Sequence, residues 1–327
     1  MEETAPSLPD AGHLTEKPLQ IQPEQLHLID PDKSVAMFHD MNVLVEWRIL
    51  SASETGGEVG RARRKQAAKL AAIFQELKSQ PAEYRVLGCV GYINQQDYIP
   101  PRLGTVFNIP QGILNSPMKK PFYSLYEYLS SQEFEDFQPS LGARFELARE
   151  LARGFLQFHQ LGWFHKNIRS HSIVFFPESE IVSTKYPFIL GFAYARPSEA
   201  GISDQAKVED ELKLYQHPEC QEKTEKGYKL RYDVFSIGLL LFEITKWRPL
   251  KTYFTRLQKR NIKMSLETFA RTLVENEKDE LEFRMGTHYA TALLTCLYGT
   301  FGVQGEDLKD TRLKLAYFVK NLALCSA

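Results

Sequence analysis

The strongest hydrophobic pattern along the chain lies between residues 141 and 160, where apolar side chains recur at the spacing of an α-helix. Gly162 follows at a position that favours a helix end. Residues 168–176 then have the pattern of a short turn that leads into a strand. The pattern therefore predicts a helix, a loop and a strand in succession. The apolar face of the predicted helix consists of Ala148, Leu151, Ala152, Phe155 and Phe158.

The first hundred residues combine strand-like and helical patterns. Residues 35–38 and 43–50 are rich in β-forming side chains and are separated by a short polar link, which predicts a hairpin. Residues 61–78 carry apolar side chains at helical spacing and predict a helix, preceded by a loop at residues 51–60. The predicted order is strand, strand, helix, strand, strand. The last two strands are predicted at residues 84–93 and 104–109.

The N-terminus and the second half of the chain have other patterns. Residues 1–28 are rich in Pro, Glu and Gln without an apolar period, which predicts a disordered N-terminal arm. Residues 111–122 are rich in Pro and Lys and predict a loop insertion. Further helices are predicted at residues 124–129, 232–244, 264–276, 287–297 and 312–322.

Composition and charge narrow the class of protein. The 327-residue chain has a net charge of −1, so charge alone favours neither nucleic acid nor a membrane surface. Its longest apolar run, residues 237–242, is too short to span a bilayer. The four cysteines show no paired spacing, which argues against a disulfide framework and a zinc site and favours a reducing compartment. We therefore expect a cytoplasmic protein without a membrane span or a nucleic-acid partner.

Four short motifs occur in the order and at the spacing found in eukaryotic protein kinases. H-K-N at residues 165–167 stands where kinases have H-R-D, and G-F-A at 191–193 stands where they have D-F-G. H-P-E at 217–219 stands for A-P-E, and D-V-F-S-I-G at 233–238 matches a kinase helix start. Over about residues 30–325 the chain therefore resembles a protein kinase.

The resemblance implies an α+β, two-lobed fold. A small β-rich lobe with one main helix would cover residues 29–110, and a larger, mainly helical lobe would cover residues 111–327. Residues 108–110 would form the hinge. More narrowly, strings such as V-L-V-E-W and C-L-Y-G-T-F-G-V resemble the kinase-like domains of filamentous-fungal HeLo or prion-inhibition proteins.

The resemblance also marks four reactive positions, and each holds a residue that cannot perform the kinase reaction. Phosphoryl transfer needs a lysine beside the phosphates, a carboxylate that accepts a proton, and oxygen ligands for magnesium. Glu46 stands at the lysine position, Asn167 at the carboxylate position, and Ser172 and Gly191 at the two metal positions. An amide does not accept a proton near neutral pH, and glycine has no side chain for a metal. We expect no catalytic residue, no cofactor and no metal.

Nucleotide binding is not expected either. No glycine occurs between Leu19 and Asn42, so a glycine-rich phosphate loop is absent from the sequence. A carboxylate at Glu46 would repel a triphosphate, although Arg48 offers a displaced cation two residues later. We hypothesise instead that Glu46 forms a swapped ion pair with Lys69 of the following helix.

The positions that hold a kinase fold together keep suitable residues. By resemblance, His165 and Phe192 would stack on each other, and Asp233 would accept backbone hydrogen bonds from the 165–167 loop. Glu219 and Arg312 would form a buried ion pair. Reactive groups are lost while scaffold groups survive, which predicts a catalytically inactive kinase fold.

The resemblance leaves three functions open. The first is a pseudokinase that acts as a signalling or scaffold module through a protein partner. Its working surfaces would be the segment at residues 193–214, the basic run at residues 61–65 and the lysine-containing insertion. The second is a divergent protein kinase that uses displaced residues such as Arg48 and the acidic residues 209–211. The third is an inactive kinase fold that still binds nucleotide.

Overall fold

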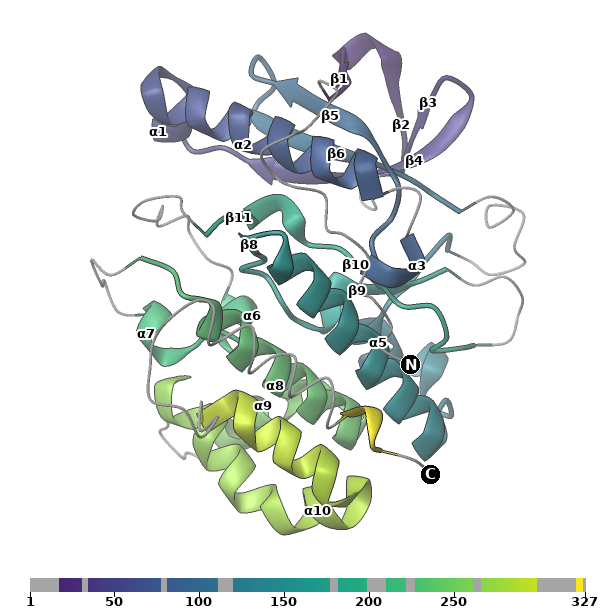
Figure 1. The fold of residues 1–327 in the computed structure, drawn as a ribbon, viewed down its shortest axis with the longest axis vertical. Coiled ribbons are helices and arrows are strands. Elements are labelled where there is room, and N and C mark those ends of the chain that lie inside the picture. Colours follow the sequence, from purple (N-terminus) through teal and green to yellow (C-terminus); the bar gives the residue numbers. More distant parts are fainter. Residues whose placement is uncertain are drawn as a thin grey trace, which may run out of the picture.

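The computed structural model of the chain describes residues 18–30, 35–77, 81–110, 120–176, 182–198, 210–221, 227–260, 266–298 and 322–325. Its architecture is α+β, with a β-rich part near the N-terminus and a mainly helical part after it (Figure 1). One large hydrophobic core runs from the long helix of the β-rich part into the helices of the other part. The α+β class predicted from the sequence is confirmed.

Six strands form the sheet of the β-rich part: β1 (Gln20–Ile21), β2 (Leu26–Asp30), β3 (Val35–Phe38), β4 (Met41–Ile49), β5 (Cys89–Gln95) and β6 (Arg102–Asn108). Their order is β1-β5-β6-β4-β3-β2, and only the β1–β5 pair is parallel. The edge strands β1 and β2 are joined by only the short 3₁₀ helix η1 (Pro23–Gln25). The two edges must therefore approach each other, and the sheet is curled.

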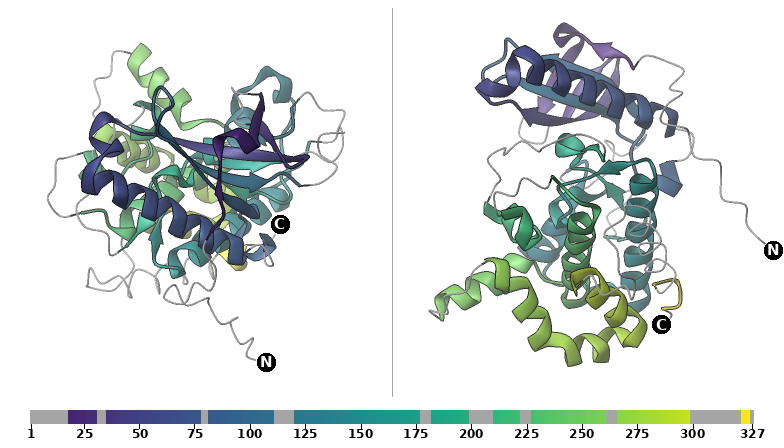
Figure 2. Two further views of the ribbon diagram at one scale, coloured as in Figure 1. Left: turned by 90° about the horizontal axis from the view of Figure 1, so that it is seen from above. Right: turned by 60° about the vertical axis from the view of Figure 1, so that its left-hand side comes forward.

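The two faces of the sheet pack against different groups. The short helix α1 (Ala52–Thr55) leads into α2 (Gly57–Glu76), which lies across one face (Figure 2). Alternate strand residues point to opposite faces, so Leu44 joins the main core with α2. Val43 and Val45 of the same strand join a second cluster on the other face, within the curl. The sheet thereby positions the side chains of β4 on both faces.

Several predictions for this part need comment. The predicted hairpin is confirmed, and its two turn residues, His39 and Asp40, have positive φ angles of 44° and 60°. The predicted disordered arm is wrong for residues 18–28, because β1 and part of β2 lie there with Ile21 and Leu26 buried. These strands are too short for a visible alternation. Residues 1–17 lie outside the described residues.

Two predicted boundaries are also wrong. The predicted loop at residues 51–60 contains α1 and the start of α2, because Ser51 and Glu54 form a capping box at the first turn. The predicted strand at residues 84–93 begins only at Cys89, and it is preceded by the short helix α3 (Pro81–Tyr84).

The second part contains α4 (Leu125–Ser130), α5 (Leu141–Gln160), α6 (Asp210–Lys213), α7 (Pro218–Gln221), α8 (Leu230–Lys246), α9 (Leu250–Lys259) and α10 (Leu266–Tyr298). Five short strands accompany them: β7 (Tyr123–Ser124), β8 (Trp163–Phe164), β9 (Ile173–Phe175), β10 (Phe188–Ile189) and β11 (Arg196–Pro197). The predicted apolar face of α5 is buried throughout, and Gly162 follows its end with a φ of 79°. Helix α8 is buried on nearly all sides and forms the centre of this part.

The C-terminal predictions are only partly testable. The two helices predicted at residues 264–276 and 287–297 correspond to α10, which has a break at Gly286 (φ 76°, ψ 164°). Helix α9 was not predicted, since its residues are largely polar. The helix predicted at residues 312–322 lies outside the described residues apart from Leu322.

Candidate functional site

One buried carboxylate holds the loop that follows β8. Asp233, in the first turn of α8, is fully buried. It accepts hydrogen bonds from the backbone N–H groups of His165 (2.7 Å) and Lys166 (2.9 Å). His159 Nε2 (3.0 Å) and the Tyr228 hydroxyl (2.7 Å) also donate to it. Burial opposes ionisation, but these bonds outweigh it and lower the pKa of Asp233. The geometry matches the contact expected for Asp233.

The imidazole of His165 packs within an aromatic group. Its ring centroid lies 4.7 Å from that of Phe192 at an interplanar angle of 57°, so the expected contact is present but tilted. On the other side of Phe192, the ring of Phe74 from α2 lies 4.6 Å away. His165 Nε2 donates to the Leu190 carbonyl oxygen at 3.0 Å, and Nδ1 accepts from the backbone of Asn167 at 3.3 Å. Burial lowers the pKa of His165 to about 4, so the ring is neutral.

Three of the four positions marked by the kinase resemblance lie close together in the structure: Asn167, Ser172 and Gly191. The Asn167 side chain donates to the Gly191 carbonyl oxygen at 3.4 Å. The Ser172 hydroxyl donates to the Arg169 carbonyl oxygen at 2.7 Å and accepts from the Arg169 N–H at 3.2 Å. These bonds are internal to the loop and its neighbour, the 3₁₀ helix η6 (Phe192–Tyr194). Ser172 and Gly191, which stand at the two metal-ligand positions of a kinase, supply no carboxylate.

The conformation of Gly191 excludes the acidic residue that a kinase would have there. Gly191 has a φ of +90°, which disfavours any residue with a Cβ atom. A Cβ atom would lie 2.8 Å from Asn167 Nδ2 and 3.0 Å from Ser172 Cβ. An aspartate cannot occupy this place unless both neighbours move. The packing of Asn167 and Ser172 thus depends on a glycine at position 191.

The Glu46 carboxylate has partners that the sequence analysis did not predict. It accepts hydrogen bonds from the backbone N–H groups of Gly191 and, at 3.0 Å, Phe192. Within the described part of the chain it forms no ion pair with Lys69, so the predicted swapped pair is wrong. The backbone N–H groups satisfy the carboxylate instead. Burial raises the pKa of Glu46 to about 7, and the two backbone bonds offset only part of that shift.

Arg48, the possible displaced cation, is engaged by a carboxylate that sequence reasoning missed. Its guanidinium donates to Glu54 Oε1 at 2.6 Å and to the Ala193 carbonyl oxygen at 3.3 Å. Glu54 also lies 3.2 Å from Arg63 Nε of α2, and it is itself buried. Glu54 lies three residues after Ser51, within the stretch predicted as a loop. The capping-box spacing of these two residues was the clue that a helix begins there.

Arg63 in turn orients an amide on the same helix. Its guanidinium donates to Gln66 Oε1 at 3.0 Å, and Gln66 Nε2 donates to the Ala195 carbonyl oxygen at 2.8 Å. The basic run at residues 61–65 therefore contains at least one residue with a structural task. Because α2 begins at Gly57, this run lies beyond the first turn of the helix, where basic residues would oppose the helix dipole.

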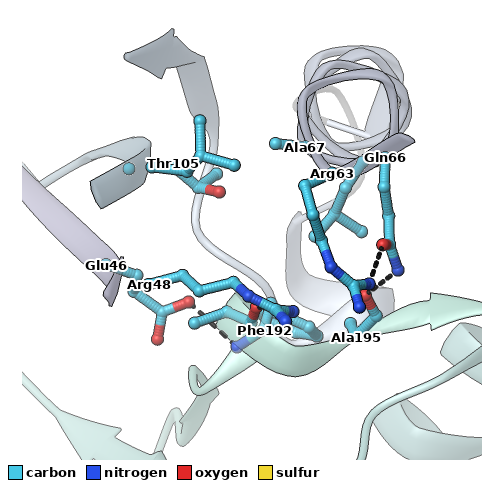
Figure 3. Close-up of a pocket in the computed structure, with 12 residues that line it drawn as sticks. Glu46, Arg48, Arg63, Gln66, Ala67, Thr105, Phe192 and Ala195 are labelled. Atoms are coloured by element: carbon cyan, nitrogen blue, oxygen red, sulfur yellow. Dashed lines mark hydrogen bonds between the residues drawn. The ribbon is translucent and has the colours of Figure 1, made fainter. Parts of the chain in front are cut away.

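A small cavity lies between the sheet, α2 and η6 (Figure 3). Its volume is about 30 Å³. Ligand pockets are usually about 300–1,000 Å³, whereas this space suits about one water molecule. The polar side chains at its wall belong to Glu46, Arg48, Arg63, Gln66 and Thr105.

The predicted partner of Glu219, Arg312, lies outside the described residues, so the predicted pair stays a prediction. The carboxylate of Glu219 pairs with Arg231, and the Tyr232 hydroxyl donates to it at 2.8 Å. Its side chain is 42% exposed rather than buried.

Two of the predicted working surfaces are described only in part. Residues 199–209 of the segment at 193–214, and residues 111–119 of the insertion, lie outside the described ranges. No cluster of three or more His, Cys, Asp or Glu side chains suited to a metal occurs among the residues that the structure describes. In the same ranges, none of the helices has the length and apolar character needed to cross a bilayer.

Comparison with known proteins places the chain in a family without assigning an activity. The model of a family described as a domain of unknown function (DUF7580) matches residues 103–317, which is more than half of the chain. The match includes Asn167, Ser172, Gly191 and Asp233 but not Glu46. No curated protein matches the chain. The protein therefore belongs to the DUF7580 family.

Proposed function

We propose that the protein is a pseudokinase, with a two-lobed, protein-kinase-like fold that binds a protein partner and does not transfer phosphate. The order β3, β4, α2, β5, β6 supports the kinase-like reading of the β-rich part. The hold of Asp233 on the 165–166 backbone and the His165–Phe192 contact support it for the helical part. The proposed absence of phosphoryl transfer rests on the site geometry, because the matched family has no assigned function.

The observation that carries the proposal is the packing of Asn167, Ser172 and Gly191. Asn167 donates to the Gly191 carbonyl oxygen, and the Ser172 hydroxyl donates to the Arg169 carbonyl oxygen. Neighbouring atoms occupy the space that a side chain on Gly191 would need. Magnesium binds hard oxygen ligands, preferably carboxylates, and the proton of an attacking hydroxyl needs a base. None of the three positions supplies either group.

The surroundings of Glu46 argue against a nucleotide as well. A carboxylate rather than an ammonium group faces η6, and its oxygens are taken up by two backbone N–H groups. Placing triphosphate charge beside it would add repulsion. The adjoining cavity of about 30 Å³ would have to enlarge greatly before it could accept a nucleotide.

Function then moves to the surface. We propose that a protein partner binds the segment at residues 193–214, the basic run at 61–65 or the lysine-containing insertion. All four cysteines are free thiols, which supports our assignment of the protein to a reducing, cytoplasmic compartment.

Thermal unfolding in the presence of millimolar ATP, with and without magnesium, tests the proposal. A ligand present at about 100 times its Kd stabilises a protein by roughly 2.7 kcal/mol, which is visible as a melting shift. We expect no shift under either condition. An active kinase measured in parallel shows that such a shift is detectable.

Each positive result points to a different function. A shift that requires magnesium would contradict the proposal and favour a divergent kinase that uses displaced residues. A shift that is independent of magnesium would favour an inactive fold with a structural nucleotide.

A further inference from the structure

Three side chains of the β-rich part hold the backbone of one short segment, residues 191–195 (Figure 3). Glu46 accepts two backbone N–H groups at the start of the segment. Arg48 donates to a carbonyl oxygen in its middle at 3.3 Å, and Gln66 donates to the carbonyl oxygen at its end at 2.8 Å. The hydrogen bonds use main-chain atoms of the segment, and the Arg48 guanidinium also lies 5.4 Å from the centroid of the Tyr194 ring.

The buried carboxylate of Glu54 organises two of the three holding groups. It receives Arg48 at 2.6 Å and lies 3.2 Å from Arg63 Nε. Arg63 then bonds the oxygen of the Gln66 amide, which leaves the amide NH₂ group directed at the segment. Hydrogen bonds from Ser51 and the charge of Arg48 outweigh burial and lower the pKa of Glu54, so it remains a carboxylate. Glu54 is a positioning residue.

We propose that Glu46, Arg48 and Gln66 form a clasp, positioned by Glu54, that closes the β-rich part onto residues 191–195 without any ligand. Release of the clasp is the step that changes the arrangement of the two parts. In this view the clasp does what a bound nucleotide and metal would otherwise do, which is to bridge the two parts across their junction.

The two parts are also joined on the side of α3, and that joint is built differently. There the backbone of Arg85 accepts from Ile189 at 2.6 Å, and the Arg85 guanidinium donates to Glu150 at 2.7 Å. Around the clasp, in contrast, polar side chains border a cavity, and apolar packing on this side comes from Phe192 against Phe74. We infer that opening occurs at the clasp rather than at the α3 joint.

Hydrogen exchange of the ligand-free protein, read by mass spectrometry, tests the clasp. Glu46→Ala removes both acceptors, and we expect exchange in the peptide that covers residues 191–196 to rise about five- to tenfold, the size expected for loss of a net hydrogen bond. Glu54→Gln should raise it less, through its effect on Arg48 and Gln66. Exchange in α8 should stay unchanged in both variants.

Thr105→Val is the control, because Thr105 lines the same cavity but makes none of the clasp bonds. Valine has nearly the same shape as threonine, so this change leaves the wall of the cavity in place. It should leave exchange at residues 191–196 as in the wild type. Unchanged exchange in Glu46→Ala would overturn the proposal. So would an equal rise in α8, which would indicate general destabilisation, or an equal effect of Thr105→Val. The measurement needs no nucleotide, so its outcome is independent of the ATP test.

Discussion

Asp233, which anchors the 165–167 loop, and Asn167, which lies in that loop, are both buried polar residues, yet their surroundings are built in opposite ways. Asp233 is a buried charge with four donors directed at its two oxygens. Asn167, in the loop that Asp233 holds, makes one side-chain hydrogen bond of 3.4 Å, and its Oδ1 atom has no hydrogen-bond partner among the residues that the structure describes. Hydrogen bonds satisfy both oxygens of Asp233, whereas the Asn167 side chain mainly occupies space.

The difference indicates which groups the fold depends on. A buried charge is tolerated only when hydrogen bonds compensate it, so every donor around Asp233 contributes to stability. A neutral amide that fills space contributes little beyond its volume. The structure around residue 167 therefore depends more on Asp233 than on the Asn167 side chain.

The largest expected effect comes from Asp233→Asn. The new amide would direct an NH₂ group at donors that now meet a carboxylate, and we expect a loss of about 3–5 kcal/mol in the free energy of unfolding. Urea denaturation measures it. If this variant does not fold, Tyr228→Phe removes a single donor and should cost about 1–2 kcal/mol. Losses below these ranges in both variants would contradict the role of the anchor.

A second buried carboxylate of α8 sharpens the comparison. Glu243 Oε1 accepts hydrogen bonds from the Tyr215 hydroxyl at 2.6 Å and from the Leu250 N–H at 2.7 Å, whereas Oε2 has no hydrogen-bond partner among the described residues. Burial raises the pKa of Glu243 to about 7. Because the folded-state pKa lies above the unfolded one, its stabilising contribution is present below the unfolded pKa and is lost as pH rises through about 7.

Glu243→Gln should therefore stabilise the protein at alkaline pH. The amide oxygen can keep both bonds while the ionisable group disappears. We expect a gain of about 2–3 kcal/mol at about pH 8 and little change at about pH 5, since one pKa unit corresponds to about 1.4 kcal/mol. Urea denaturation of both proteins at the two pH values measures it. A gain that does not depend on pH would show that ionisation of Glu243 is not the cause.

Sequence reasoning located the elements better than it located the contacts. The helix at α5 and the hairpin of β3 and β4 follow from local periodicity and were predicted. The partners of Glu46 and the role of Glu54 depend on which backbone atoms the fold brings near them, and no local pattern encodes that. The prediction of Lys69 as the partner of Glu46 assumed that a buried carboxylate pairs with a basic side chain. In the structure, the backbone N–H groups of Gly191 and Phe192 donate to Glu46 instead.

The smallest expected effect is that of Asn167→Ala, at the position of the kinase base. The bond that it removes is long, and the oxygen that it removes has no hydrogen-bond partner, so deletion takes away little favourable interaction and one costly buried acceptor. The small void left behind acts in the opposite direction. We expect the free energy of unfolding to change by at most about 1 kcal/mol, measured by urea denaturation beside Asp233→Asn. A loss as large as that of the anchor variant would mean that the two regions form one cooperative unit, and the distinction between anchor and former reactive site would fail.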